Sequence, residues 1–338
     1  MPHEAQHDSL ENGPATGEAP AAGTAQPLRV LVVTNMYPTA ERPSRGIFVQ
    51  SQVEALRRTG EVEIDLAAFS ASGAPWRYAV MAARFAPRGR AADLVHAHYG
   101  LSGLAALRAA AHAPLILTVH GRDCHHPLVR PVTAFVGRRA AAVVAVSHEL
   151  AGLCPVAVAE VIPPGVDLRR FQPLPRAEAR RRLSLDPLRR VVLFPADPRR
   201  PEKRYDLAKA LISGVPGVDL RAYDNVPTDR VPLLVNAADA VIVTSDREGY
   251  GLACMEALAC DVPVLSTPVG IAREVLPGVA GTLCARFDLA LWRSHLKELL
   301  ADPDPHVKGR DVAARQSTDV MARRTIALYR RVLRRAAG

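Results

Sequence analysis

Two glutamates, Glu248 and Glu256, stand eight positions apart around a turn that contains Gly249 and Gly251. The apolar run 240–244 before the turn predicts a buried strand, and apolar residues after it recur at helical spacing. The start of such a helix offers free backbone N–H groups to an anion. At about 1.5 Å of rise per residue, Glu256 lies roughly 6–8 Å along the helix axis from that start.

This spacing suits a ligand with a central diphosphate and a hydroxylated group at each end, as in a nucleotide sugar. The diphosphate would meet the helix start, while Glu248 and Glu256 would each accept hydrogen bonds from hydroxyl groups. An ordinary α/β turn with two solvated glutamates fits the same residues.

A second candidate site is the basic turn 197–204, which follows the predicted strand 191–194. Its cations stand at the carboxyl end of a strand, where they would neutralise a diphosphate leaving group. Lys203 and Arg200 are the residues that we select for this role, with Arg199 as the alternative to Arg200. A solvated basic turn is the other interpretation of this segment.

The motif Glu-x7-Glu with Gly-x-Gly after the first Glu is followed by Glu-Ala-Leu-Ala and Val-Pro-Val-Leu-Ser-Thr-Pro-Val-Gly. Together they resemble the donor-site signature of the GT-B retaining glycosyltransferases, and most of all family 4, the glycogen-synthase-like group. The segment Ile-Pro-Pro-Gly-Val-Asp, which ends at Asp167, is similar to the interdomain segment of that family. The resemblance implies an α/β fold of two Rossmann-like domains, with parallel sheets that face each other across a cleft.

The resemblance also implies roles for particular residues. Glu248 would bind sugar hydroxyls and Glu256 the ribose, while Arg200 and Lys203 carry the phosphate charge. Backbone N–H groups of the turn would assist at Gly249, Tyr250, Gly251 and Leu252.

The N-terminal half contributes fewer candidates. The segment from His120 to Asp123 is similar to the family's His-Gly-x-Asp, so His120 would approach the donor sugar. Asp123 and Ser147 follow predicted strands at the edge of the sheet where ligands bind. Gly46 is the candidate for the family's phosphate-binding glycine, although the usual Gly-Gly pair is missing; a glycine that starts a helix is the alternative.

Alternating strands and helices predict the domain organisation. A single helix is predicted over 101–111. The expected parts are a disordered tail over 1–27, an N-terminal acceptor-binding domain over 28–165, a linker over 166–190, a nucleotide-sugar domain over 191–305 and a C-terminal helix over 306–338 that packs back on the N-terminal domain.

Composition excludes several other classes of protein. The net charge of +9 suits anionic partners, but aromatic residues make up only 5% and provide no stacking platform for nucleic acid. Five cysteines without a C-x-x-C pair, no signal-peptide pattern and no apolar run of membrane-spanning length indicate a cytoplasmic protein. The basic C-terminal helix is expected to be solvated, with peripheral contact to the inner face of the membrane as the alternative.

Other chemistries lack their motifs. No G-x-G-x-x-G follows the first strand, and neither a G-x-S-x-G elbow nor a P-loop is present. The histidines around Cys124 match no standard zinc spacing. The only Asp-x-Asp, at Asp302, lacks the preceding strand of a metal-dependent glycosyltransferase. The resemblance likewise implies a metal-independent enzyme in which protein cations and helix N–H groups replace the metal.

The sequence therefore predicts a retaining, hexosyl-type glycosyltransferase that uses a nucleotide-diphosphate sugar as co-substrate and needs no cofactor. Cell-envelope or exopolysaccharide glycan synthesis is the preferred setting. The sugar and the acceptor stay open, and a lipid-linked acceptor is among the options. The alternatives are a nucleotide-sugar epimerase on the same fold and a non-catalytic, basic surface-binding protein.

Overall fold

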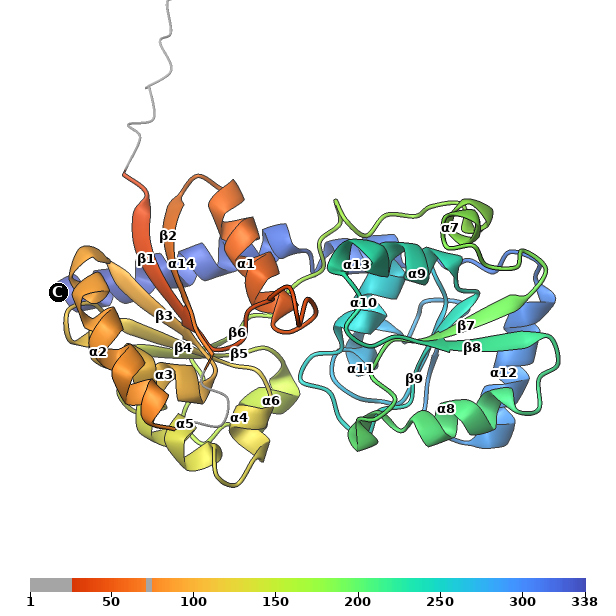
Figure 1. Ribbon diagram of the computed structural model, residues 1–338, viewed down its shortest axis with the longest axis horizontal. Helices are drawn as coiled ribbons and strands as arrows, with labels where there is room; N and C mark the ends of the chain where they lie inside the picture. Colours follow the sequence, from red (N-terminus) through yellow and green to blue (C-terminus); the bar gives the residue numbers. More distant parts are fainter. Residues whose placement is uncertain (1–25, 71–74) are drawn as a thin grey trace, which may run out of the picture.

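The computed structural model describes residues 26–70 and 75–338, so the tail predicted over 1–27 lies outside the described residues except for its last two positions. The chain forms two parallel β-sheets, one of six strands and one of five, with helices on both faces of each (Figure 1). This arrangement confirms the α/β class with two parallel sheets. In the described part of the chain, no helix combines the length and apolar character that a membrane span requires.

The first sheet has the strand order β2-β1-β3-β4-β5-β6. Its strands are β1 (Leu28–Thr34), β2 (Val62–Ala68), β3 (Leu94–His98), β4 (Leu115–Val119), β5 (Ala142–Ala145) and β6 (Glu160–Val161). Successive side chains of β1 point to opposite faces, and both sets are buried. Val30 and Val32 belong to one core cluster, whereas Leu31 and Val33 belong to another.

Helices cover both faces of this sheet. The cluster around Val30 contains residues of α1 (Ile47–Arg58) and α14 (Thr318–Ala337). The cluster around Leu31 contains residues of α2 (Trp76–Ala91), α3 (Gly100–Ala106) and α5 (Arg130–Gly137). Helix α14, the last element of the chain, thus completes the core of the first sheet (Figure 1).

The second sheet has the order β11-β10-β9-β7-β8. Its strands are β7 (Arg190–Phe194), β8 (Val218–Ala222), β9 (Ala240–Val243), β10 (Val264–Ser266) and β11 (Leu283–Cys284). Val192 and Phe194 pack with residues of α8 (Tyr205–Ile212) and α12 (Leu289–Ala301). The opposite face carries α9 (Val231–Ala237), α10 (Leu252–Ala259), α11 (Ala272–Val275) and α13 (Arg310–Ala314).

The chain crosses between the two sheets twice, and the two crossings are hydrogen-bonded to each other. The Val166 N–H donates to the Gln316 carbonyl at 2.9 Å, and the Thr318 N–H donates to the Val166 carbonyl at 3.0 Å. Gly165, at φ 73°, lies directly against this contact, and a Cβ there would stand 2.7 Å from the Ser317 backbone. Only glycine combines that φ with that proximity.

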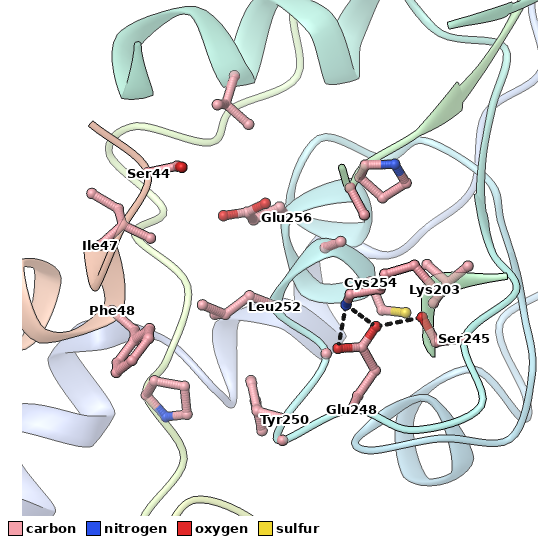
Figure 2. A pocket seen from close by; sticks show the side chains of 18 of the residues that line it. Ser44, Ile47, Phe48, Lys203, Ser245, Glu248, Tyr250, Leu252, Cys254 and Glu256 are labelled. Carbon is pink, nitrogen blue, oxygen red and sulfur yellow. Dashed lines mark hydrogen bonds and ion pairs between the residues drawn. The ribbon is translucent and has the colours of Figure 1, made fainter. Parts of the chain in front are cut away.

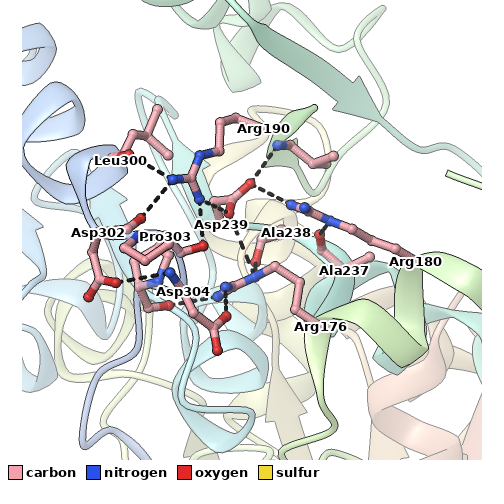
Figure 3. A network of polar contacts seen from close by, with 12 residues as sticks. Arg176, Arg180, Arg190, Ala237, Ala238, Asp239, Leu300, Asp302, Pro303 and Asp304 are labelled. Carbon is pink, nitrogen blue, oxygen red and sulfur yellow. Dashed lines mark hydrogen bonds and ion pairs between the residues drawn. The ribbon is translucent and has the colours of Figure 1, made fainter. Parts of the chain in front are cut away.

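A buried ion network holds helix α7 (Arg176–Arg182) on the second sheet (Figure 3). Its centre is Asp239, whose side chain is fully buried. One Asp239 oxygen accepts from Arg180 at 2.6 Å, and the other accepts from Arg190 at 3.1 Å. Arg176 donates to the Ala238 carbonyl at 3.0 Å. The second half of the segment 166–190 is therefore attached to the second sheet.

Candidate active site

A cavity of about 350 Å³ lies between the carboxyl ends of the two sheets, which is where ligands of parallel α/β sheets bind. One wall is formed by the loop before α1, the start of α1 and the loop after β4. The loop after β7 and the turn before α10 form the other. Figure 2 shows Ile47 and Phe48 facing Leu252 and Glu256 across this space. The cavity brings together these predicted site residues: His120, Arg200, Lys203, Glu248, Gly249, Tyr250, Gly251, Leu252 and Glu256.

Lys203 and Glu248 form an ion pair on the wall of the second sheet (Figure 2). Lys203 ends the short helix η2 (Pro201–Lys203), and its Nζ lies 2.6 and 2.7 Å from the two carboxylate oxygens of Glu248. The Ser245 hydroxyl donates to the same carboxylate at 2.7 Å. The two charged side chains are only 13% and 15% exposed. The pair therefore places a desolvated ammonium group and a carboxylate at one point of the cavity.

The start of α10 points its first turn into the cavity. Gly251 occupies the position before the helix at φ 95°, and Leu252 begins it. No acidic residue stands in this first turn, so no carboxylate of that turn competes with a ligand for its N–H groups. The helix start and the Lys203 ammonium thus supply positive charge to the same cavity.

Glu256 lies one turn further along α10 and lines the cavity with Arg170 and Tyr223. Desolvation raises the pKa of Glu256 from 4.5 to about 7, and the positive charge of Arg170 opposes this rise. The Nε of Arg170 is buried and has no hydrogen-bond partner among the described residues. Arg170 and Tyr223 each stand far from the donor-site motif along the chain, so neither was predicted from the sequence.

His120 stands in the opposite wall, directly after β4. Its ring packs on Phe48 with centroids 4.5 Å apart, and its Nε2 lies 3.1 Å from the Nδ1 of His98. Burial lowers the pKa of the His120 imidazole well below its ordinary value. The wall from the first sheet therefore presents a neutral imidazole to the charged groups of the second.

Asp123 holds the His120 loop in place through hydrogen bonds to its backbone. Its fully buried carboxylate accepts from the backbone N–H groups of His120 at 2.9 Å and Gly121 at 2.7 Å. Burial raises the pKa of Asp123 to about 6, although these backbone hydrogen bonds act in the opposite direction. Asp123 does not line the cavity between the sheets, and its contacts are those of a residue that holds the loop.

Gly46 and Ser147, which were also predicted, lie outside this cavity as well. Gly46 precedes α1 at φ 72°, against the Met36 carbonyl. Ser147 caps α6 (His148–Leu153), because its Oγ accepts from the Leu150 N–H at 3.2 Å. It borders a separate, smaller pocket beside the cavity.

The structure distinguishes the two arginines of the basic turn. Arg200 lines the cavity and donates to Glu202 at 2.6 Å. Arg199 points to solvent, with a side chain 78% exposed that is paired with Asp197 and Asp224. Arg200 is thus the arginine that shares the cavity with Lys203. Within the residues described, no three His, Cys, Asp or Glu side chains form a cluster that could hold a metal ion.

Comparison with known proteins identifies the family. Residues 21–170 match Glycosyltransferase Family 4, and residues 216–316 match Glycosyl transferases group 1. A D-inositol 3-phosphate glycosyltransferase of Segniliparus rotundus is 30% identical over 303 residues, which cover 72% of this chain and 67% of that protein. The chain belongs to glycosyltransferase family 4. This confirms the family that the donor-site motif indicated.

A second relative with the same name, from Thermobispora bispora, is 32% identical over 270 residues. That match covers 63% of this chain and 63% of the relative, so this family 4 chain spans somewhat less than two thirds of that protein's length.

Solved structures show the fold. Sucrose-phosphate synthase from Thermosynechococcus elongatus superposes with a TM-score of 0.76 at 19% identity, over 92% of this chain and 100% of that one. Anabaena HepE, in complex with UDP and glucose, gives a TM-score of 0.67 at 15% identity, over 88% of this chain and 98% of that one. The family 4 chain therefore has the GT-B fold, as predicted.

Proposed function

We propose that this family 4 protein is a retaining glycosyltransferase that transfers a hexosyl group from a nucleotide-diphosphate sugar to an acceptor hydroxyl. The observation that supports this most directly is the content of one cavity. The Lys203–Glu248 ion pair, Glu256 and the start of α10 all stand on one wall, and His120 stands on the other. These are the groups that a diphosphate between two hydroxylated rings requires.

Each group of the cavity has a role in the proposed reaction. The Lys203 ammonium, the Arg200 guanidinium and the N–H groups at the start of α10 stabilise the negative charge that grows on the leaving diphosphate. Glu256 accepts hydrogen bonds from the ribose, and Glu248 accepts them from the sugar. Lys203 is already oriented by Glu248 before any ligand binds, which lowers the cost of ordering its side chain.

The proposed chemistry takes place on one face of the sugar. The bond from the anomeric carbon to the diphosphate oxygen breaks, and a bond to the acceptor oxygen forms on the same face. The acceptor's proton passes to the leaving diphosphate, so no separate base is needed. His120 lies on the wall opposite Glu248, where it contacts the transferred sugar. Closure of the two domains would exclude water and limit hydrolysis of the donor.

The comparisons suggest where to look for substrates. The HepE structure contains UDP and glucose, so we propose a UDP-hexose as the first donor to test. The sequence relatives bear the name D-inositol 3-phosphate glycosyltransferase, which makes a polyol hydroxyl one acceptor candidate. Cell-envelope and exopolysaccharide glycans, including lipid-linked precursors, are the other candidates that we propose.

Thermal unfolding against UDP-, GDP-, ADP- and TDP-sugars tests the donor site. A ligand at 100 times its dissociation constant stabilises the folded state by about 2.7 kcal/mol, a clearly visible shift. We expect a shift with one nucleotide that is lost in Glu256→Ala and kept in Glu298→Ala, a matched exposed glutamate on α12. No shift with any donor, or a shift that survives in Glu256→Ala, would contradict the proposed donor site.

Product analysis separates transfer from isomerisation. A transferase releases nucleoside diphosphate only as sugar appears on an acceptor. An epimerase on the same fold would instead convert the sugar nucleotide to an isomer with no acceptor present. Formation of such an isomer would replace the proposed function with the epimerase alternative.

A further inference from the structure

Three imidazoles, of which those of His96 and His98 are buried, stand in a row between the cavity and the C-terminal helix α14. The ring centroids of His120 and His98 are 5.3 Å apart, and those of His98 and His96 are 4.3 Å apart. At the far end, His96 is fixed through both nitrogens: Nδ1 lies 2.6 Å from the Tyr329 hydroxyl and Nε2 lies 2.7 Å from the Thr118 hydroxyl. The row is therefore anchored in the protein core at one end.

The contact between His98 and His120 restricts the protons of both rings. The two nitrogens, Nδ1 of His98 and Nε2 of His120, are 3.1 Å apart, a hydrogen-bond distance. Burial lowers the pKa of both imidazoles, so both rings are neutral. A neutral imidazole has one N–H donor and one acceptor nitrogen. One of the facing nitrogens must therefore carry a proton and the other must lack one.

This restriction also affects how His120 can bind a ligand in the cavity. Once the state of His120 Nε2 is set, the state of its other ring nitrogen, Nδ1, is set as well. Nδ1 makes no hydrogen bond to the described residues, which leaves it available to a ligand in the cavity that His120 lines. His98 itself is 1% exposed and does not line this cavity. Its influence on a ligand must pass through His120.

We propose that His98 is a positioning residue of this glycosyltransferase: its hydrogen bond to His120 Nε2 holds the His120 ring in one orientation and ties its tautomer to that of His98, and so decides whether Nδ1 donates to or accepts from the bound sugar. The inference rests on the proposed function for the ligand concerned. The coupling of the two rings can be measured without any turnover.

The first test is ring-nitrogen NMR of the ligand-free, full-length protein labelled with ¹⁵N-histidine, since ring ¹⁵N shifts distinguish the two tautomers. We expect a single His120 tautomer in the wild type and a mixture of both in His98→Ala. His98→Asn, whose amide retains a hydrogen-bonding group near the position of Nδ1, should return His120 towards one tautomer. His112→Gln, at an exposed histidine, should leave the His120 signals unchanged.

The second test is kinetic and uses the variants whose thermal unfolding shows that they fold. A misdirected His120 should reduce kcat by about 10- to 100-fold in His98→Ala while KM for the donor changes by less than about 3-fold. His98→Asn should recover part of kcat. Equal losses in both variants would assign His98 a purely structural role and overturn the proposal.

The NMR result can also overturn it. A His120 spectrum that keeps one tautomer in both His98 variants would show that other contacts orient the ring. If the wild-type protein turns over no sugar nucleotide, the proposed function fails, but the NMR test of the His98–His120 pair still gives its answer.

Discussion

The carbonyl oxygen of His120 fills the space where a Cβ on residue 249 would stand. His120 follows the strand β4 of the first sheet, and Gly249 belongs to the turn before α10 of the second. The backbones of the two domains thus touch at the cavity, which both residues line. This contact requires glycine because any side chain would push the two loops apart.

We expect Gly249→Ala to lower kcat at least 10-fold while the protein stays folded, since a 1 Å displacement of reacting groups can cost about 100-fold. Gly152→Ala is the control, because a Cβ at that position of α6 meets nothing within 4 Å. Steady-state kinetics beside thermal unfolding would measure both effects. An unchanged kcat in Gly249→Ala would show that the close contact has no part in turnover.

Lys203→Met removes the ammonium group and keeps most of the side-chain length. If Lys203 stabilises the leaving diphosphate, kcat should fall by about 10²- to 10³-fold. Lys297→Met, at an exposed lysine on α12, should change kcat very little. A loss in Lys203→Met that appears only in KM would assign the residue to ground-state binding instead.

Because of Glu256, stability and donor binding should both depend on pH, but in opposite directions. Its folded-state pKa is raised, so ionisation of this carboxylate costs stability as the pH rises from about 5 through 7. Glu256→Gln avoids this cost and should stabilise the ligand-free protein at pH 8 by up to about 3 kcal/mol, a gain that disappears near pH 4.5. Denaturant unfolding across this pH range measures it.

Donor affinity should change with pH in the opposite direction to stability. In the wild type, binding should strengthen as the pH rises through about 7, because the ionised carboxylate is the better hydrogen-bond acceptor for ribose hydroxyls. In Glu256→Gln, affinity should be weaker and independent of pH over the same range. Calorimetric titration with the donor would measure both, and equal affinities at pH 8 would contradict the ribose assignment.

Asp239→Ala should destabilise the protein by about 3–5 kcal/mol, since it leaves the guanidinium groups of Arg180 and Arg190 without their buried partner. The exposed Glu61–Arg330 pair offers the comparison, and Glu61→Ala should cost less than about 1 kcal/mol. Urea unfolding gives both values. Similar losses in the two variants would mean that the network around α7 contributes no more than a surface pair.

Much of the architecture could be predicted from the sequence because parallel strands are continuous apolar runs. The run 240–244 corresponds to β9, and the helix after the glycine turn begins at Leu252. The edge strand β8 has no such pattern, because it is only partly buried and carries Asp219 and Arg221. The single helix expected over 101–111 was wrong: it divides into α3 and the short helix η1 (Ala109–Ala111), which packs tightly against Gly89 of α2.

The site could be predicted only in part, for a physical reason. Lys203 and Glu248 were each identified within a local motif, but their contact depends on how β7 and β9 pair in the second sheet. Arg170 and His98 lie outside the donor-site motifs. Arg170 reaches the cavity from the first crossing between the sheets, and His98 meets His120 because β3 and β4 are neighbours.

The paired crossings at Val166 make the second half of the fold an insertion. Residues 167–315 leave and re-enter the first domain through two adjacent segments, which are joined by the isolated β-bridge between Val166 and Ser317. A hybrid that exchanged donor specificity between relatives would therefore need two junctions, one in each of these segments. A single junction would pair α14 with a foreign first sheet, so the loss of stability would appear in the half built on that sheet rather than in the half that was exchanged.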